Sequence, residues 1–147
     1  MVGVLLARDP DPIGEWFADA AAFDAAGADA LCVDCGPDTA WDVLALAAAL
    51  AVVTYRARLM VSLPDDPPAR TVDTIRRLSR GRLMLTGWEL WETVPIPDGR
   101  AAWAACRADA AERGVDGLVV PADPRLLDIL RNPEDPGDRH DLQLAQG

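Results

Sequence analysis

Ala26-Gly27-Ala28-Asp29-Ala30-Leu31-Cys32-Val33 and Arg113-Gly114-Val115-Asp116-Gly117-Leu118-Val119-Val120 are two copies of one pattern, with Gly, Asp, Leu and Val at the same offsets. In each copy the glycine follows a stretch with helical periodicity and precedes a short apolar run. This order is typical of a helix that ends at a glycine and leads into a buried strand. The repeat indicates a chain built from successive units of helix and strand.

Five apolar runs are short enough to be buried strands, each bounded by Gly, Asp or Pro. They are Gly3 to Ala7, Ala30 to Asp34, Arg58 to Ser62, Arg82 to Leu85 and Gly117 to Val120. Helical patterns separate them, so the strands should run parallel, because the chain must cross back over the sheet each time. The predicted class is α/β, with one domain over residues 1–131 and an irregular tail over residues 132–147.

Helix boundaries are marked by Asp-Pro pairs and by glycines. Each Asp-Pro pair predicts a capping carboxylate followed by proline at the first helical position, and each glycine predicts a helix end. The predicted starts are Asp11-Pro12, Asp66-Pro67 and Asp123-Pro124, with Thr39 and Asp42 as a variant capping box, and the predicted ends are Gly27, Gly81 and Gly114. The stretch from Trp41 to Val53 is apolar nearly all round, which favours a helix buried on more than one side.

The composition narrows the classes of partner. The 147 residues carry a formal charge of −10, and all 14 basic side chains are arginine. Such a charge disfavours nucleic acid and anionic membranes, so we expect a small molecule or another protein as partner. The first residues lack the basic leader and long apolar run of an export signal, and the cysteine count, three, is odd. We therefore expect a cytoplasmic protein with reduced thiols.

Three stretches together resemble the luciferase-like, flavin- or F420-dependent monooxygenase family. The stretch from Ala20 to Asp34 is similar to the family's first helix and second strand, and Asp38 to Leu59 is similar to the next helix and strand. The most specific stretch is Pro67 to Leu85, which contains Leu78-Ser79-Arg80-Gly81-Arg82 and resembles the family's Leu-Ser-x-Gly-Arg turn and fourth strand. The resemblance implies a cofactor such as FMN or F420 and a flavin-dependent oxidoreductase acting on a small apolar substrate.

The family fold is a (β/α)₈ barrel of about 250 residues, and this chain is much shorter. The resemblance therefore implies a partial TIM-type barrel that keeps strands one to four and the last strand, with Trp88 to Asp98 as the bridge between them. In a closed barrel the last strand neighbours the first, so the implied sheet order is 4-3-2-1-last. Such a sheet has two open edges, and we expect a homodimer that covers the edges or the apolar helices.

Ligands of parallel β/α folds bind beyond the carboxyl ends of the strands. The predicted cofactor-binding residues at this end are Arg8, Ser62, Thr86, Trp88 and Arg125, with Arg125 in the first turn of a helix, where an anion is favoured. A solvated surface charge is the alternative for Arg125. Arginines at the opposite end are expected to be structural, namely Arg56, Arg58, Arg80, Arg82 and Arg113.

Members of the family usually carry a histidine just after the second strand, where this chain has Asp34-Cys35-Gly36. Asp34 and Cys35 are therefore the weak candidates for catalysis, because the sole histidine, His140, lies in the tail. Cys32 and Cys35 match a bare C-x-x-C pattern, but Cys32 is better explained as a small core residue.

Trp88 and Trp91 could line a ligand pocket, form an interface or fill the space of the missing strands, and the last is favoured. Two further functions stay open: a non-catalytic interaction protein that pairs with itself or with a full-length relative, and a β/α domain that binds another phosphorylated ligand at the helix start formed by Asp123 to Arg125.

Overall fold

The computed structural model describes residues 1–7, 10–34, 40–63, 66–85 and 89–133. Its strands are β1 (Val2–Leu5), β2 (Ala30–Asp34), β3 (Arg58–Ser62), β4 (Leu83–Met84), β5 (Trp91–Thr93) and β6 (Gly117–Pro121). Its helices are α1 (Ile13–Ala25), α2 (Val43–Val53), α3 (Ala69–Leu78), α4 (Arg100–Glu112) and α5 (Pro124–Arg131). Helices and strands alternate along most of the chain, as the sequence predicts.

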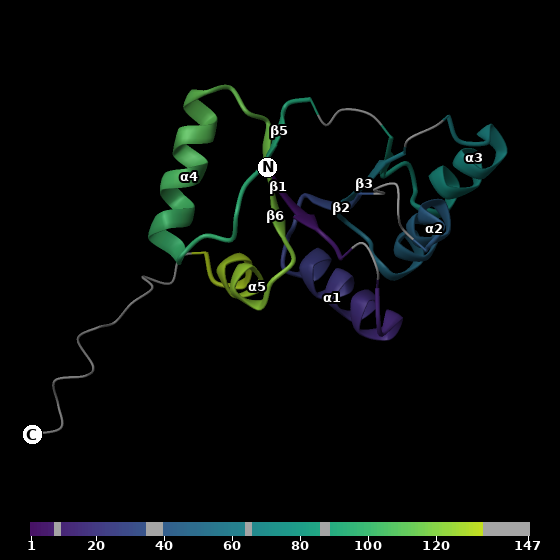
Figure 1. Ribbon diagram of the computed structural model, residues 1–147, viewed down its shortest axis with the longest axis horizontal. Coiled ribbons are helices and arrows are strands. Elements are labelled where there is room, and N and C mark those ends of the chain that lie inside the picture. The colour runs from purple at the N-terminus through teal and green to yellow at the C-terminus, as the bar shows by residue number, and fades with distance from the viewer. Residues whose placement is uncertain (8–9, 35–39, 64–65, 86–88, 134–147) are drawn as a thin grey trace, which may run out of the picture.

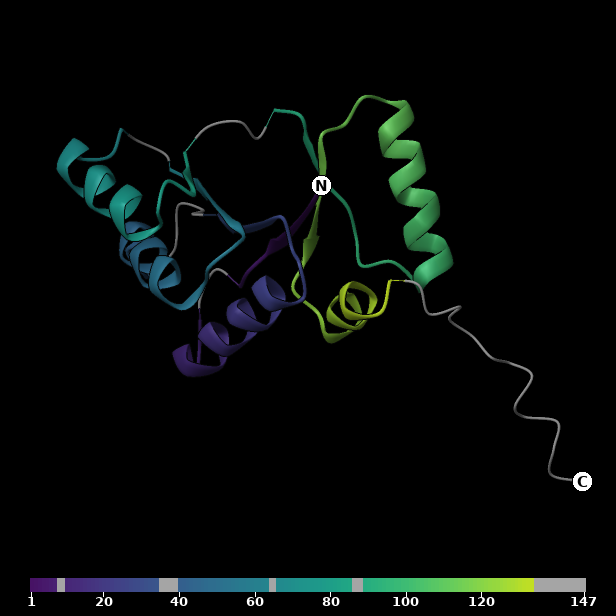
Figure 2. The same cartoon turned by 180° about the vertical axis from the view of Figure 1, so that it is seen from behind.

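The strands form one six-stranded sheet in the order β4-β3-β2-β1-β6-β5, and every neighbouring pair is parallel. The sheet is curled into a half-barrel, and Figures 1 and 2 show α1, α2 and α3 following one another around it. The predicted α/β class is confirmed, and the five predicted strands lie in the predicted order.

The sixth strand, β5, is missing from the sequence prediction. It adds three residues to the free side of β6, with Trp91, Glu92 and Thr93 opposite residues 117–119. The segment Trp91-Glu92-Thr93 carries no apolar run that would indicate a buried strand, and its pairing with β6 is a tertiary contact. The bridge between β4 and α4 is therefore partly sheet.

Alternating side chains divide the sheet into two apolar faces. The helix-facing side holds the main core, in which Val4, Leu31 and Val61 pack with residues of all five helices. The other face holds a smaller cluster of Ala30, Cys32, Met60 and Val119, packed with Leu5, Met84 and Trp91. Ala30, Cys32 and Met60 are fully buried within one chain, so these side chains need no partner subunit to cover them.

A buried polar network joins α1, the turn before β3, and β4. The Asp24 carboxylate accepts hydrogen bonds from the backbone N–H groups of Tyr55, Arg56 and Ala57, at 2.8, 2.9 and 2.6 Å. The Arg82 guanidinium donates to the carbonyl oxygens of Ala51, Thr54 and Ala57 and to the Thr54 hydroxyl. The same turn is thus held from both sides, and Arg82 is a structural arginine, as predicted.

Arg113 also has a structural role: it pairs with Asp109 on its own helix and with Glu92 of β5. This pair of contacts ties the end of α4 to the edge strand. Of the other three arginines in that group, Arg58 is exposed and donates to the Met1 sulfur at 3.5 Å.

The predicted helix ends are confirmed and the predicted starts only in part. Gly27, Gly81 and Gly114 have φ angles of 93°, 80° and 75°, the left-handed conformation that closes a helix at low cost only with glycine. Asp123 caps α5 by accepting from the Arg125 N–H, with Pro124 in the first helical position.

Three predicted starts need correction. α1 begins at Ile13 and α3 at Ala69, so Pro12 and Pro68 occupy the cap positions and neither Asp11 nor Asp66 caps a helix. α2 begins at Val43 with Asp42 itself as the cap, accepting from the N–H groups of Leu44 and Ala45. Thr39, the other residue of the predicted capping box, lies outside the described residues. In each case the helix starts one to three residues later than the sequence pattern indicates.

α2 is apolar nearly all round, but the chain buries only one side of it, so the predicted burial on more than one side is not found within a single chain. Leu46, Ala47 and Leu50 face the core, whereas Val52 is 61% exposed on the opposite side. Among the described helices, none is both long enough and apolar enough to cross a membrane.

Candidate functional site

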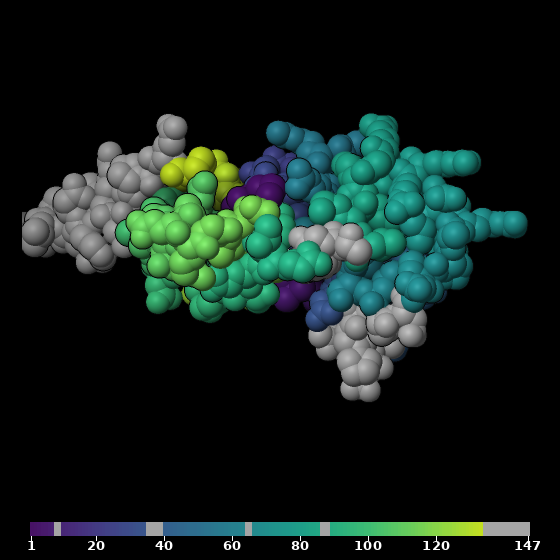
Figure 3. Space-filling model, turned by 90° about the horizontal axis from the view of Figure 1, so that it is seen from above, coloured from purple at the N-terminus to yellow at the C-terminus, as the bar shows by residue number. Residues whose placement is uncertain are grey.

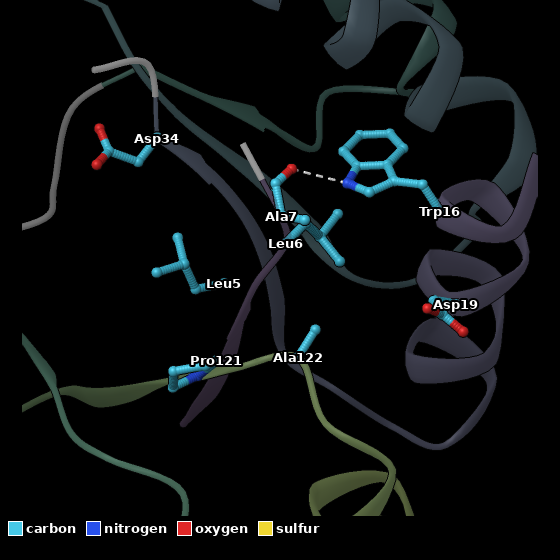
Figure 4. Close-up of a pocket in the computed structure, with 8 residues that line it drawn as sticks. All are labelled: Leu5, Leu6, Ala7, Trp16, Asp19, Asp34, Pro121 and Ala122. Atoms are coloured by element: carbon cyan, nitrogen blue, oxygen red, sulfur yellow. Dashed lines mark hydrogen bonds between the residues drawn. The ribbon is translucent and has the colours of Figure 1, made fainter. Parts of the chain in front are cut away.

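A pocket of about 370 Å³ opens at the carboxyl ends of β1, β2 and β6, the central strands of the sheet (Figure 4). Its walls come from these strand ends and from the first turns of α1. The lining residues are Leu5, Leu6, Ala7, Trp16, Asp19, Asp34, Pro121 and Ala122. The pocket therefore lies where parallel β/α folds place their ligands.

The positions of the lining side chains follow from the alternation of side chains along each strand and from the spacing of residues along α1. Asp34 ends β2 on the same face as Cys32, two residues earlier, and Pro121 ends β6 two residues after Val119. Trp16 is buried, and its indole N–H donates to the Ala7 carbonyl at 2.9 Å, which attaches α1 to the end of β1 (Figure 4). Asp19 follows Trp16 by three residues and so lies beside it on the helix.

The described lining is mainly apolar, and its two charged groups are the Asp19 and Asp34 carboxylates. No basic side chain belongs to the described part of this lining. These two carboxylates can accept hydrogen bonds from a ligand with N–H or O–H donors. The walls suit a small apolar ligand with a few hydrogen-bond donors.

The predicted site residues are only partly brought together. Asp34 lines the pocket, and Ser62 lies opposite Asp34 in the β2–β3 register without lining the pocket. Arg8, Cys35, Thr86 and Trp88 lie outside the described residues. Trp16 and Asp19 were missed as site residues, because the helical stripe that contains Trp16 predicts only a core position.

Arg125 lies elsewhere, at a separate hollow of about 540 Å³ between the starts of α4 and α5. Its guanidinium pairs with Asp123 at 3.1 Å, and its backbone N–H donates to the same carboxylate at 2.8 Å. These bonds lower the pKa of Asp123. The guanidinium and the backbone N–H of Arg125, which could bind a phosphate, are therefore already bonded to the Asp123 carboxylate.

Trp91 fills the inner face of the sheet. A Cβ added to Gly117 would lie 2.5 Å from the Trp91 ring, and one added to Gly3 would lie 3.0 Å from it, so the indole rests on both glycines. This packing makes Trp91 part of the small apolar cluster on that face of the sheet. Trp88 cannot be placed in the same way, because it falls outside the described residues.

Cys32 is a core residue. It is fully buried, and burial raises the pKa of its thiol to about 12, which keeps it protonated and unreactive. Within the described ranges, no three His, Cys, Asp or Glu side chains gather in a way that could hold a metal ion.

Comparisons with known proteins leave the chain without an assigned relative. No family model matches it, and neither the curated proteins nor the solved structures include a match.

Proposed function

We propose that this protein is a ligand-binding half-barrel, a shortened relative of the luciferase-like monooxygenases, which holds a small and largely apolar molecule at the carboxyl-end pocket. The observation that carries the proposal is the apolar pocket across the ends of β1, β2 and β6. Kinship is supported by the parallel order β4-β3-β2-β1-β6, which is the order expected of the first four strands and the last strand of a barrel.

A flavin is the ligand that the family resemblance implies, and the described walls fit only part of it. The flat ring system suits the apolar strand ends and the Trp16 side of the pocket. The phosphate of FMN needs a cationic or N–H-rich cradle, but the described lining carries two carboxylates, and Arg125 is bonded to Asp123 at another hollow. The described residues therefore supply no cradle for the phosphate of FMN.

Fluorescence titration with lumiflavin, which has the ring but no phosphate, and with FMN tests this proposal. We expect lumiflavin to bind at least as tightly as FMN, because the described lining offers the phosphate no basic side chain. Unchanged fluorescence of both flavins up to about 1 mM, where binding is worth only about 4 kcal/mol, would rule out flavin as the ligand. Tighter binding of FMN would contradict the charge argument.

A substitution that fills the pocket tests whether the flavin binds there. Ala122→Phe places a ring in the cavity and should weaken lumiflavin binding by about tenfold or more, since a pocket of this size has no room for both rings. Ala101→Phe, on the exposed side of α4, adds the same bulk away from the pocket and should leave binding unchanged. Should lumiflavin bind, oxidation of a small apolar substrate by reduced flavin is the reaction to assay next.

The second candidate function is a non-catalytic interaction protein that pairs with itself or with a full-length relative. One observation favours it: α2 carries no charged residue from Val43 to Val53, yet one side of this helix faces solvent. The mass of the protein in solution tests it, because a chain of 15.7 kDa that stays monomeric at high concentration would exclude self-pairing.

A further inference from the structure

The outer side of the helices α1, α2 and α3 changes in charge from one helix to the next. α2 lies between the other two and contacts both (Figures 1 and 2). The exposed charges of α1 are the carboxylates Glu15 and Asp19, of which Asp19 also lines the pocket, and those of α3 are three arginines and one aspartate, Arg70, Asp73, Arg76 and Arg77. The layer therefore runs from acidic through neutral to basic.

The neutral centre of this layer is an apolar stripe. Trp41, Ala45 and Val52 are exposed, and Ala48 and Ala49 between them are half-buried. Within α2 the spacing of three and four residues places Ala45, Ala48, Ala49 and Val52 along one side of the helix, and Trp41 directly precedes the cap residue Asp42. We call these five residues the α2 stripe.

We propose that a second copy of this chain docks on the α2 stripe about a twofold axis parallel to α2, so that α1 of each copy faces α3 of the other. This inference rests on the second candidate function and is independent of the pocket. It names both the surface and the orientation of the pair.

The size of the stripe shows that neighbouring helices must take part. Eleven residues of helix extend about 16 Å, and a helix is about 10 Å wide, so one helix face covers a footprint of only about 160 Å². Stable interfaces bury about 800 Å² on each partner. The contact has to extend onto α1 and α3, and their charges then determine which orientation forms.

Two limiting orientations exist for a symmetric pair that meets through this face. An axis perpendicular to the helices places α1 over α1 and α3 over α3, so that like charges face each other. An axis parallel to the helices places α1 of each copy over α3 of the other. The carboxylate of Glu15 then faces the helix that carries the arginines. Only the parallel axis brings opposite charges together. Contact between like charges would make binding less favourable in the perpendicular orientation.

Sedimentation equilibrium over a range of concentrations tests the surface. The wild type should show twice the chain mass of 15.7 kDa. Val52→Asp should weaken the pair by about hundredfold, because the new carboxylate would be buried in the interface without a partner. Val52 is 61% exposed, so this variant should keep its fold, as checked by circular dichroism. A monomeric wild type, or a dimer that Val52→Asp leaves intact, overturns the proposal.

Reciprocal charge reversal tests the orientation. Arg70→Glu and Glu15→Arg should each weaken the dimer by about tenfold, because both residues lie in the first turns of their helices and each change replaces two symmetry-related attractions with repulsions. The double variant should recover close to the wild-type dissociation constant. The control is Arg107→Glu on α4, which lies at the opposite end of the molecule from α3 (Figure 3) and should have no effect. Failure of the double variant to recover overturns the parallel orientation.

Discussion

Asp24 shows how one side chain can stabilise a turn that the sequence does not predict. It is 4% exposed and accepts three backbone N–H groups from residues 31 to 33 positions further along the chain. Burial by itself would raise its pKa, but the N–H groups of Ala57, Tyr55 and Arg56 and the charge of Arg82 outweigh burial, and the pKa is lowered. The carboxylate is therefore the form that the fold requires.

The pH dependence of stability follows from this shift. Because the folded pKa of Asp24 lies below the unfolded value of about 3.9, its contribution is complete above that value and is lost as pH falls through the folded pKa. We expect Asp24→Asn to lower the free energy of unfolding at pH 7 by about 1–3 kcal/mol. The difference from wild type should narrow below about pH 4. Urea unfolding at several pH values measures this, and a constant difference would contradict it.

At the scale of elements, the position of β5 depends on the packing of one large side chain, a tryptophan, against two glycines of neighbouring strands. Trp91 packs on Gly3 and Gly117, and the bond from the Val94 N–H to the Val119 carbonyl continues the pairing beyond the strand. A strand of three residues makes few ladder hydrogen bonds, so the ring contact contributes much of what attaches β5 to β6.

A double-mutant cycle tests that contact. Gly117→Ala would bring a methyl group within 2.5 Å of the Trp91 ring and should destabilise the protein by about 1–3 kcal/mol. In a Trp91→Ala background the same change should cost much less, since the clash is gone. Gly114→Ala, whose cost comes from a φ of 75° and not from a contact, should be equally unfavourable in both backgrounds. Equal effects of Gly117→Ala in both backgrounds would show that the ring does not rest there.

Across the whole molecule, β1 joins two groups of strands. It pairs with β2 on one side and with β6 on the other, and the helix-facing core includes residues from both sides. The two edge strands, β4 and β5, have only two and three residues, which limits pairing with another sheet.

A shared core predicts a single unfolding transition for the described domain. Thermal unfolding followed by far-ultraviolet circular dichroism and by tryptophan fluorescence should give the same midpoint, because Trp16 and Trp103 lie in the one core to which all five helices contribute. Two separate midpoints would show that the β2–β4 side and the β5–β6 side unfold independently.

Local pattern alone was enough to predict the parallel α/β class, the five strands other than β5 and the glycine helix ends, because each depends on residues close together in the chain. The position of Asp34 at the end of a buried strand was also predictable from the apolar run before it. The resemblance to a larger barrel supplied the expected strand order.

Only the tertiary structure decided the rest. β5, the buried turn held by Asp24 and Arg82, and the pocket between Trp16, Asp34 and Pro121 all join segments far apart in the sequence. Sequence periodicity reports whether a side chain faces the core, but it contains no information on which distant backbone will meet that side chain. Arg125, which the sequence suggests as an anion site, lies away from the pocket, and its guanidinium is bonded to the neighbouring Asp123.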